Sequence, residues 1–507
     1  MPKIATRVHD LLTDAVATCP HTTALINGTD SRFSWADLAV SVEAAVELLQ
    51  QQHIRPGDRV LLVFENCLSV VAFLYAASQL DALSVVVNAR VTDVELQRVV
   101  THCDPAAVVF SVDVSTSASE HAARMKAEPV TGSFGEVAIS QRSGTIADTV
   151  FEEPDQQVAV LLYTSGTTGA PKAAMLTHQN LISGAIASAT LRGSREGDVC
   201  YLVLPLSHVF GLVTLFAMTS CKATIRLEPR FDVARLYDAL NQDVTIFPAV
   251  PQMHARLFQY ARERNIASYT HGRLRYVSSG GAPLDPTWKR EAENFYGMAM
   301  QNGYGLSETS AGVCATRNSI GENDISVGVP MGECVLKLDL DSVGANPQSG
   351  IGEVMVKGPQ VMKGYYRDPQ QTALVIDSEG YFRTGDLGWI DEHGNLHIAG
   401  RSKELIIRSG FNVYPVEVEA ALTTHPEVVL AAVVGRAVEG NEEVLAFVQV
   451  APGCKLTEDQ LKKFVSGQLA PYKRPSRIIV TEELPVAATG KILKSKLIDV
   501  FSGELLD

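Results

Sequence analysis

The stretch that decides the fold is Val158-Ala-Val-Leu-Leu-Tyr163, followed directly by Thr164-Ser-Gly-Thr-Thr-Gly-Ala-Pro-Lys172. The first part is a continuous apolar run of strand length, typical of a strand buried in a parallel sheet. The glycines, proline and hydroxyl side chains of the second part predict a loop whose amides can surround phosphate oxygens. Lys172 would add one positive charge to this phosphate cradle. A plain Ser/Thr/Gly turn between two strands is the alternative.

The loop does not have the spacing of a Walker loop, in which Gly is followed by four residues and then by Gly-Lys-Ser/Thr. Gly166 and Gly169 are too close together, and the Walker spacing occurs nowhere else in the sequence. This disfavours a P-loop kinase or ATPase. Such an enzyme, and a nucleotide-binding module without catalysis, stay open as alternatives of another class.

Around this loop, strand-like apolar runs alternate with helix-like periodic segments, which is typical of an α/β protein. Strands are expected at 59–64, 83–87, 199–204, 244–247, 274–278 and 395–399, and helices at 69–80, 233–241 and 285–296. The segment 112–148 is richer in Ser, Thr and Gly, and we expect a surface excursion with weak structure there.

A domain boundary is expected near Arg401, which divides the chain into a large N-terminal domain, 1–400, and a small C-terminal domain, 401–507. The smaller part has its own α/β pattern, with helices at 415–423, at 458–469 and from 492, and strands at 428–434, 444–450 and 477–481. Pro415 suits the first position of a helix because that position needs no amide hydrogen. About a hundred residues suffice for an independent domain.

The composition is that of a globular protein: 507 residues, 46% hydrophobic and 20% charged. The net charge of −14 argues against general binding to nucleic acid or to an anionic membrane. Polar residues interrupt the apolar stretch 69–89, which therefore predicts a buried helix and strand and no membrane span. The start of the chain does not resemble a signal peptide, and eight scattered cysteines form no CxxC pair, so we expect a reducing, cytoplasmic location.

Residues 163–172 closely resemble the phosphate-loop signature of the adenylate-forming superfamily, which includes acyl-CoA synthetases, aryl-CoA ligases, peptide-synthetase adenylation domains and beetle luciferase. Other segments resemble further motifs of this family and follow its order, so the resemblance covers nearly the whole chain. They are Leu204-Pro-Leu-Ser-His-Val-Phe-Gly211, Ser279-Gly-Gly-Ala-Pro-Leu284, Asn302-Gly-Tyr-Gly-Leu-Ser-Glu-Thr309, Tyr381-Phe-Arg-Thr-Gly-Asp386, Gly400-Arg401 and Leu484-Pro-Val-Ala-Ala-Thr-Gly-Lys491. The nearest members in type are fatty-acid and aryl-acid CoA ligases.

The resemblance implies an ATP-dependent acid–thiol ligase. Such an enzyme forms an acyl-adenylate and pyrophosphate, then an acyl-CoA and AMP, with ATP, Mg²⁺ and coenzyme A. It also implies that the small C-terminal α/β domain is mobile and is joined to a large N-terminal α/β domain of several subdomains by a hinge near Lys403.

Roles for individual residues follow from the same resemblance. The implied catalytic residues are Lys172, His208 beside the acyl pocket, Thr309 and Lys491, and Glu308 is the implied Mg²⁺ ligand. The residues implied to bind ATP or coenzyme A are Thr164, Ser165, Gly166, Thr167, Thr168, Gly169, Gly281, Ala282, Pro283, Asn302, Gly303, Tyr304, Asp386, Arg401, Gly410, Tyr472 and Arg474. Their chemistry is suitable, since Tyr304 can stack on adenine and Asp386 can accept both ribose hydroxyls.

Two segments favour coenzyme A over a carrier protein as the acyl acceptor, although the carrier stays an alternative. Ser409-Gly-Phe-Asn-Val-Tyr-Pro415 resembles the lining of a pantetheine tunnel, and Pro471-Tyr-Lys-Arg-Pro475 resembles a contact to the CoA nucleotide. One departure is Glu439-Gly-Asn-Glu-Glu443, which lacks the Trp-Gly-Glu of many relatives and leaves the wall of the thiol tunnel undefined.

For the substrate acid, the sequence indicates only its polarity. The candidate lining segments 209–212, 247–252 and 309–313 are mainly apolar, which favours a fatty or aromatic monoacid over a dicarboxylate. The expected partner is therefore a small carboxylic acid, without nucleic acid or a membrane span. A monomer and a homodimer are both compatible with the sequence.

Overall fold

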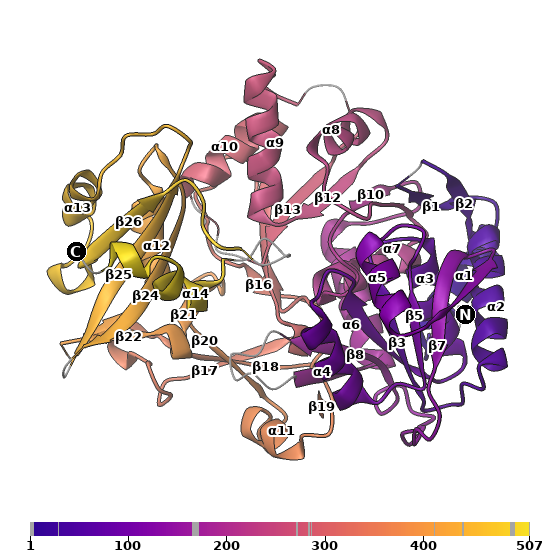
Figure 1. Cartoon of the computed structure of the whole chain (residues 1–507). Helices are drawn as coiled ribbons and strands as arrows, with labels where there is room; N and C mark the ends of the chain where they lie inside the picture. Colours follow the sequence, from indigo (N-terminus) through magenta and orange to yellow (C-terminus); the bar gives the residue numbers. More distant parts are fainter. Residues whose placement is uncertain are drawn as a thin grey trace.

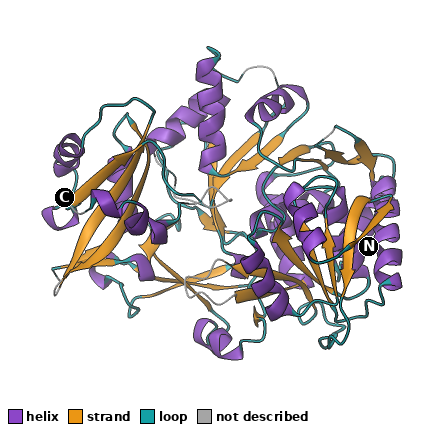
Figure 2. Cartoon of the chain, viewed as in Figure 1, coloured by secondary structure: helices purple, strands orange, loops and turns teal. Residues whose placement is uncertain are grey.

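The computed structural model of the chain describes residues 5–28, 30–164, 172–269, 272–281, 284, 286–409, 411–438, 441–486 and 492–505. Helices and strands alternate along most of this part, and they form a large N-terminal body beside a smaller C-terminal unit (Figure 1). Figure 2 shows the strands of each part gathered into sheets with helices against them. The expected α/β class, with one large and one small part, is confirmed.

The first sheet of the N-terminal body has a parallel centre and antiparallel edges. Its strands stand in the order β16-β15-β14-β13-β12-β10-β11-β1-β2, and the six from β14 to β1 are parallel. Their bounds are β1 (Thr23–Asn27), β2 (Arg32–Ser34), β10 (Val199–Leu202), β11 (Thr224–Leu227), β12 (Ile246–Ala249), β13 (Tyr276–Gly280), β14 (Met300–Tyr304), β15 (Cys314–Ala315) and β16 (Val329–Pro330).

The second sheet is built in the same way. Its order is β19-β9-β8-β4-β3-β5-β7-β6, with parallel strands from β8 to β5 and antiparallel strands on both sides. Their bounds are β3 (Arg59–Phe64), β4 (Leu83–Asn88), β5 (Ala107–Phe110), β6 (Glu128–Gly132), β7 (Gly135–Gln141), β8 (Val158–Thr164), β9 (Lys172–Thr177) and β19 (Gly364–Tyr365).

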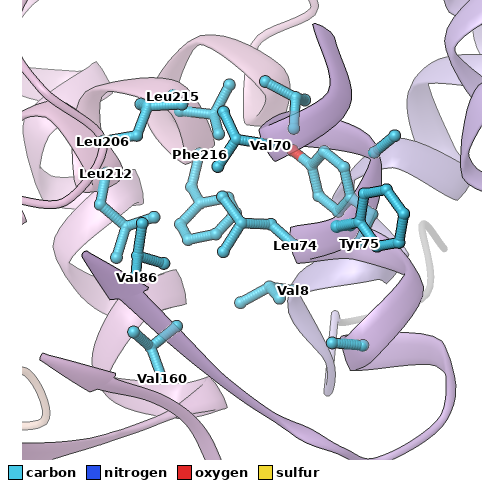
Figure 3. Packing of buried hydrophobic residues seen from close by; sticks show 14 of the residues in the cluster. Val8, Val70, Leu74, Tyr75, Val86, Val160, Leu206, Leu212, Leu215 and Phe216 are labelled. Carbon is cyan, nitrogen blue, oxygen red and sulfur yellow. The ribbon is translucent and has the colours of Figure 1, made fainter. Parts of the chain in front are cut away.

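Two helices without a polar face, α3 (Leu68–Gln79) and α7 (Val209–Ser220), share the main core with strands of both sheets. A helix that is apolar all round must be buried on every side, and a layer between two sheets satisfies this. The core joins Phe216 and Leu212 of α7 to Leu74 and Tyr75 of α3, as Figure 3 shows. The Tyr75 hydroxyl donates to Thr219 Oγ1 at 2.9 Å, so this buried polar group has a partner.

The remaining helices of the body cover the sheets. The main core also includes α1 (Val8–Thr18), α2 (Trp35–Gln51) and α6 (His178–Arg192). Against the other faces lie α4 (Asp93–Cys103), α5 (Thr116–Arg124), α8 (Val233–Gln242), α9 (Pro251–Glu263) and α10 (Pro286–Tyr296). Among the residues with described positions, no helix combines the length and the apolar character needed to span a bilayer.

The expectation of weak structure over 112–148 was wrong. The segment contains α5 and the hairpin β6–β7, and β7 pairs with β5 to extend the second sheet. Only Val137, Ala138 and Ile139 of β7 are buried, whereas β6 is an edge strand that is exposed along most of its length. Half-exposed edge elements need few apolar residues, and their composition is therefore close to that of a loop.

The C-terminal third starts with an antiparallel sheet and ends with a compact unit. The antiparallel sheet contains β17 (Val335–Asp339), β18 (Gly352–Lys357), β20 (Phe382–Ile390) and β21 (Leu396–Arg401), with α11 (Pro369–Val375) beside it. The compact unit contains β22 (Ile406–Arg408), β23 (Phe411–Val413), α12 (Pro415–Thr423), β24 (Val428–Val438), β25 (Asn441–Val450), α13 (Glu458–Ser466), β26 (Arg477–Thr481) and α14 (Lys494–Val500). Two apolar clusters lie wholly within this unit.

The link between the two parts passes through a short 3-10 helix, Ser402–Glu404, directly after β21. Lys494 on α14 contacts the end of this link, since its Nζ lies 3.0 Å from Glu404 Oε2 and 2.8 Å from Glu419 Oε1. The Tyr414 hydroxyl donates to the Gly344 carbonyl at 3.0 Å and connects the unit to the antiparallel sheet. The domain boundary near Arg401 and the hinge at Lys403 stay predictions.

Phe216→Ala is expected to destabilise the N-terminal body by about 3–5 kcal/mol, because it removes a fully buried ring and leaves a cavity. Phe216 also makes an edge contact with Tyr75 at a centroid distance of 5.9 Å. Denaturant unfolding followed by tryptophan fluorescence measures the change. Val40→Ala, at a side chain 60% exposed, is the control and should change stability by no more than about 0.5 kcal/mol. Equal effects of the two changes would contradict the placement of α7 in the core.

Candidate active site

Three parallel strands of the first sheet, β12, β13 and β14, end next to one another. The motif 279–284 begins in the last residues of β13, and the motif 302–309 begins in those of β14. Ala249 on β12 pairs with Ser279 on β13, and Gly280 on β13 pairs with Gly303 on β14. Because the carboxyl ends of parallel strands form one edge of a sheet, they are the usual ligand-binding edge of an open α/β sheet. The register therefore brings the segment from Ser279 beside the segment from Asn302. The Asn302 side chain itself is buried and donates to the Ser326 carbonyl at 2.9 Å.

A pair of glycines lies at this edge, with apolar side chains beside it. Gly281 has a φ of +79°, which favours glycine, and a Cβ added there would lie 3.9 Å from Val250 Cγ1. A Cβ added to Gly280 would lie 3.1 Å from the ring of Phe210 on α7. The histidine motif of α7 and the segment after β13 are therefore in contact. The Phe210 ring packs directly against Gly280, and with Val250 it gives this edge an apolar character.

The loop after β14 is held in one shape by its own atoms. A Cβ on Gly305 would lie 1.1 Å from the Ala311 carbonyl oxygen, so only glycine fits. The Leu306 N–H donates to Thr309 Oγ1 at 2.9 Å, and the Thr309 hydroxyl donates to the Leu306 carbonyl at 3.2 Å. Thr309 is fully buried, and its hydroxyl serves the loop in this structure. Its contact to a phosphate stays a prediction.

The structure brings three expected nucleotide-binding residues together from three strands. The Tyr304 hydroxyl donates to Asp386 Oδ2 at 2.5 Å, and Arg401 Nε lies 3.3 Å from Asp386 Oδ1. Asp386 and Arg401 are register partners on β20 and β21. Burial, and next the Asp386 carboxylate, raise the pKa of Tyr304 well above its ordinary value, so the phenol stays a neutral donor. The carboxylate is thus oriented by a phenol on one oxygen and by a guanidinium on the other.

Glu308 and Lys172 both contact Tyr365, and Lys172 also contacts Gln371, two residues that the sequence analysis missed. The Tyr365 hydroxyl donates to Glu308 Oε1 at 2.8 Å, and Lys172 Nζ lies 5.5 Å from the centre of the Tyr365 ring. Lys172 Nζ donates to Gln371 Oε1 at 2.9 Å. Burial, and next Glu308, raise the pKa of Tyr365. No spacing rule connects residue 365 to residue 308, because the contact depends on how β19 pairs.

The Glu308 carboxylate fits a magnesium ion. Mg²⁺ is typically held by one or two carboxylates together with water and substrate phosphate oxygens. One oxygen of Glu308 accepts the hydrogen bond from Tyr365, and the side chain is half-buried, so access from the strand edge is retained. The other oxygen is the candidate metal ligand.

His208 is the N-cap residue of α7 and is placed by contacts between the two sheets. The Leu206 N–H donates to Asn66 Oδ1 at 2.9 Å, and Asn66 Nδ2 donates to the Leu204 carbonyl at 3.0 Å. Asn66 follows β3 of the second sheet, so its amide joins the carboxyl edges of both sheets. The His208 residue is exposed, but the surrounding protein still lowers the pKa of its imidazole through desolvation. It is therefore neutral at neutral pH.

Tyr472 and Arg474 contact other residues of the C-terminal unit. The Tyr472 ring stacks on Phe411 with a centroid distance of 4.7 Å and an interplanar angle of 26°. Arg474 Nε donates to the Leu469 carbonyl and its Nη2 to the Ser466 carbonyl, at 2.9 and 2.7 Å. Phe411 was not singled out by the sequence analysis. In the structure 54% of its surface is exposed, so its ring is accessible to a ligand. The roles of Tyr472 and Arg474 toward coenzyme A stay predictions.

Several expected site residues lie outside the described residues. They are Ser165, Gly166, Thr167, Thr168, Gly169, Ala282, Pro283, Gly410 and Lys491. Thr164 lies just before the gap at residues 165–171 and is the register partner of Lys172 across β8 and β9. The two ends of the phosphate-loop segment are therefore side by side, next to Tyr365.

Comparisons with known proteins agree with the two-part architecture. A family model described as AMP-binding enzyme matches residues 12–366, and one described as AMP-binding enzyme C-terminal domain matches 417–491. The chain is 31% identical to a 4-coumarate–CoA ligase of Vanilla planifolia, over 93% of this chain and 89% of the relative. It is 30% identical to a long-chain-fatty-acid–CoA ligase of Bacillus subtilis, over 97% and 94%.

A solved structure shows the same fold. The O-succinylbenzoate coenzyme A synthetase of Bacillus subtilis, in complex with ATP and magnesium ion, superposes with a TM-score of 0.80 at 27% identity. The match covers 96% of this chain and 98% of that one. The similarity therefore extends over both the N-terminal body and the C-terminal unit.

Asp386→Asn is expected to raise the KM for ATP about tenfold or more, because it removes a buried carboxylate that can accept ribose hydroxyls. The KM for the acid should change less than about twofold, and steady-state kinetics with each substrate varied in turn measure both values. Asp391→Asn is the control, since Asp391 lies in the turn between β20 and β21 and contacts Asn395 and His397. A similar rise in both variants, or a rise in the acid KM alone, would contradict the assignment of Asp386.

Proposed function

Because this chain belongs to the AMP-binding enzyme family, we propose that it activates an apolar monocarboxylic acid, aromatic or fatty, at the carboxyl edge of the first sheet. The chain is an ATP-dependent acid–CoA ligase that works through an acyl-adenylate and uses ATP, Mg²⁺ and coenzyme A. This location is supported by charged groups and apolar side chains that lie near the same strand ends. The Tyr304–Asp386–Arg401 set, the Glu308–Tyr365–Lys172 set and the Phe210–Gly280 contact each include one residue at or just after the carboxyl end of β13 or β14.

In the first half-reaction, a carboxylate must attack a phosphate although both are negatively charged. Asp386 would hold the ribose and Lys172 would offset charge on the phosphates, which brings the reacting atoms together. Magnesium, when bound at Glu308, supplies further positive charge to the phosphate oxygens. Lys491, by resemblance to the catalytic lysine of the family, would reach the α-phosphate from the C-terminal unit.

The acid is proposed to be apolar because of the side chains at the glycine pair. Phe210 and Val250 lie beside Gly280 and Gly281, and the segments 209–212, 247–252 and 309–313 contain no Lys or Arg. A second carboxylate bound there would lack a cation from these segments and would be costly to desolvate. Relatives named for 4-coumarate and for long-chain fatty acids support an aromatic or a fatty acid.

The second half-reaction requires a thiol near the acyl group, and we propose that the C-terminal unit turns to admit it. The proposed hinge, Lys403, lies in the link Ser402–Glu404 and is exposed, within the interval 367–416 that separates the two family models. The stacked pair Phe411–Tyr472 offers an aromatic surface for the nucleotide of coenzyme A. A carrier protein is the alternative acceptor. The cytoplasm, where ATP and coenzyme A are available, is the proposed location, and both monomer and homodimer remain compatible.

A panel of acids assayed for AMP and pyrophosphate release, with and without coenzyme A, tests this function. Benzoate, cinnamate and hexanoate analogues should give higher kcat/KM than malonate or succinate, because no cation faces a second carboxylate. Pyrophosphate should appear in the absence of coenzyme A, whereas steady AMP release should require it. Release of ADP and phosphate would contradict adenylation, and a higher kcat/KM for the diacids would contradict the apolar pocket.

Lys491→Ala is expected to slow adenylation about a hundredfold or more, because a positioned charge on a transition state is typically worth about 3 kcal/mol or more. With synthetic acyl-adenylate and coenzyme A, the thioester-forming step should stay within about tenfold of the wild type. Lys403→Pro should slow the thioester step more than adenylation, because proline restricts the backbone rotation at the hinge. Lys496→Ala, an exposed change on α14, is the control. Equal losses in both half-reactions for the Lys491 and Lys403 variants would exclude an alternation of the two parts.

A further inference from the structure

We propose that Tyr365 is a positioning residue that orients the Glu308 carboxylate for the magnesium ion and keeps it apart from Lys172. This inference rests on the proposed function, in which Glu308 binds the metal and Lys172 binds phosphate. The Tyr365 hydroxyl donates to Glu308 Oε1 at 2.8 Å, while Lys172 Nζ lies 5.5 Å from the centre of the ring. The neutral Tyr365 side chain therefore contacts the Glu308 carboxylate through its hydroxyl and the Lys172 ammonium through its ring.

The backbone places Tyr365 at this point. Tyr365 on β19 pairs with Ala174 on β9, and Ala174 is two residues from Lys172, so the two side chains of β9 lie on the same face. The Tyr365 N–H donates to Thr372 Oγ1 at 2.9 Å, and the Thr372 hydroxyl donates to the Asp368 carbonyl at 2.9 Å. The first turn of α11 therefore fixes the strand that carries the phenol.

The same segment also holds the main chain of the metal ligand. The Met362 N–H donates to the Glu308 carbonyl at 2.8 Å, three residues before Tyr365 donates to the Glu308 carboxylate. A Cβ on Gly364 would lie 2.7 Å from Thr372 Cγ2, so glycine lets this segment pass close to α11. Residues 362–365 thus hold Glu308 at its main-chain carbonyl and at its carboxylate. A carboxylate with one oxygen already bonded has a defined direction for its other oxygen.

The Glu308 carboxylate and the Lys172 ammonium each have a neutral hydrogen-bond partner. Glu308 is bonded by the neutral phenol, and Lys172 by the neutral amide of Gln371 at 2.9 Å. Across the part of the chain that the structure describes, no carboxylate lies within ion-pair distance of Lys172. A direct ion pair between Glu308 and Lys172 would neutralise both groups before the substrates arrive. Because each charged group is bonded by a neutral side chain, both charges stay available, one for a cation and one for a phosphate.

A purely structural role is the competing explanation, since Tyr365 is 7% exposed and belongs to the main core. Tyr365→Phe separates the two roles because it keeps the ring and removes only the hydroxyl. Tyr366→Phe is a matched control on the neighbouring residue. Tyr366 is similarly buried, but its hydroxyl donates to Asp148 Oδ2 at 2.8 Å and has no contact with Glu308.

The experiment measures ATP–pyrophosphate exchange in the presence of acid, as a function of Mg²⁺ concentration, in the wild type and in both variants. In Tyr365→Phe the Mg²⁺ concentration for half-maximal activity should rise about tenfold, as is typical when an outer-shell partner of a metal ligand is lost. The rate at saturating Mg²⁺ should fall less than about threefold, and the KM for the acid should stay within about twofold. Tyr366→Phe should match the wild type in all three values.

A second readout does not depend on turnover. Mn²⁺ is titrated into each protein in the presence of a non-hydrolysable ATP analogue, and electron paramagnetic resonance follows the protein-bound ion, with a protein-free titration as the reference. The dissociation constant of the bound ion should rise at least about fivefold in Tyr365→Phe only. Unchanged Mg²⁺ and Mn²⁺ constants in an active Tyr365→Phe protein would overturn the role of Tyr365 alone. An absence of exchange in the wild type across the acid panel would overturn the proposed function, and this inference with it.

Discussion

The distance between the two sheets of the N-terminal body is the constraint on which the site depends. It is set by α3 and α7, whose sequences leave no polar face and which therefore belong in a layer covered on both sides. At the carboxyl edge, the Asn66 amide then joins the second sheet to the chain between Leu204 and Leu206 of the first. The start of α7, with His208 and Phe210, takes its position from this bond and from the core behind it.

Neutral side chains make hydrogen bonds to the charged groups of the site. Tyr304 bonds Asp386, Tyr365 bonds Glu308, and Gln371 bonds Lys172. In the described residues, Arg401 beside Asp386 is the one direct ion pair of this set, and it lies on two strands whose register fixes it. Phenols and amides orient a charged group without neutralising it, and so the group keeps most of its attraction for a ligand.

Much of the fold could be predicted because the decisive segments have strong local patterns. The strand Arg59–Phe64 and the helix Pro415–Thr423 have the bounds that the sequence indicated, since both are bordered by clear turn or cap residues. The hairpin β6–β7 was missed because an edge strand can be polar and still be paired. Of the site, the motifs on β13 and β14 could be found as continuous stretches. Tyr365 could not, because its contact with Glu308 depends on how distant segments pair. Phe411 lies within the stretch 409–415 that the sequence indicated, but its stacking on Tyr472 depends on packing that the sequence does not show.

The ammonium of Lys494 determines how the C-terminal unit is joined to the link before it. It lies between Glu404, at the end of the link to the N-terminal body, and Glu419 on α12. Burial acts to lower the pKa of Lys494, but Glu419 and Glu404 outweigh it and raise the pKa, so the charge is retained. One cation thus joins α14 and α12 to the end of the link. Two helices that are far apart in the sequence therefore share a single ionic contact to the segment that connects their unit to the rest of the chain.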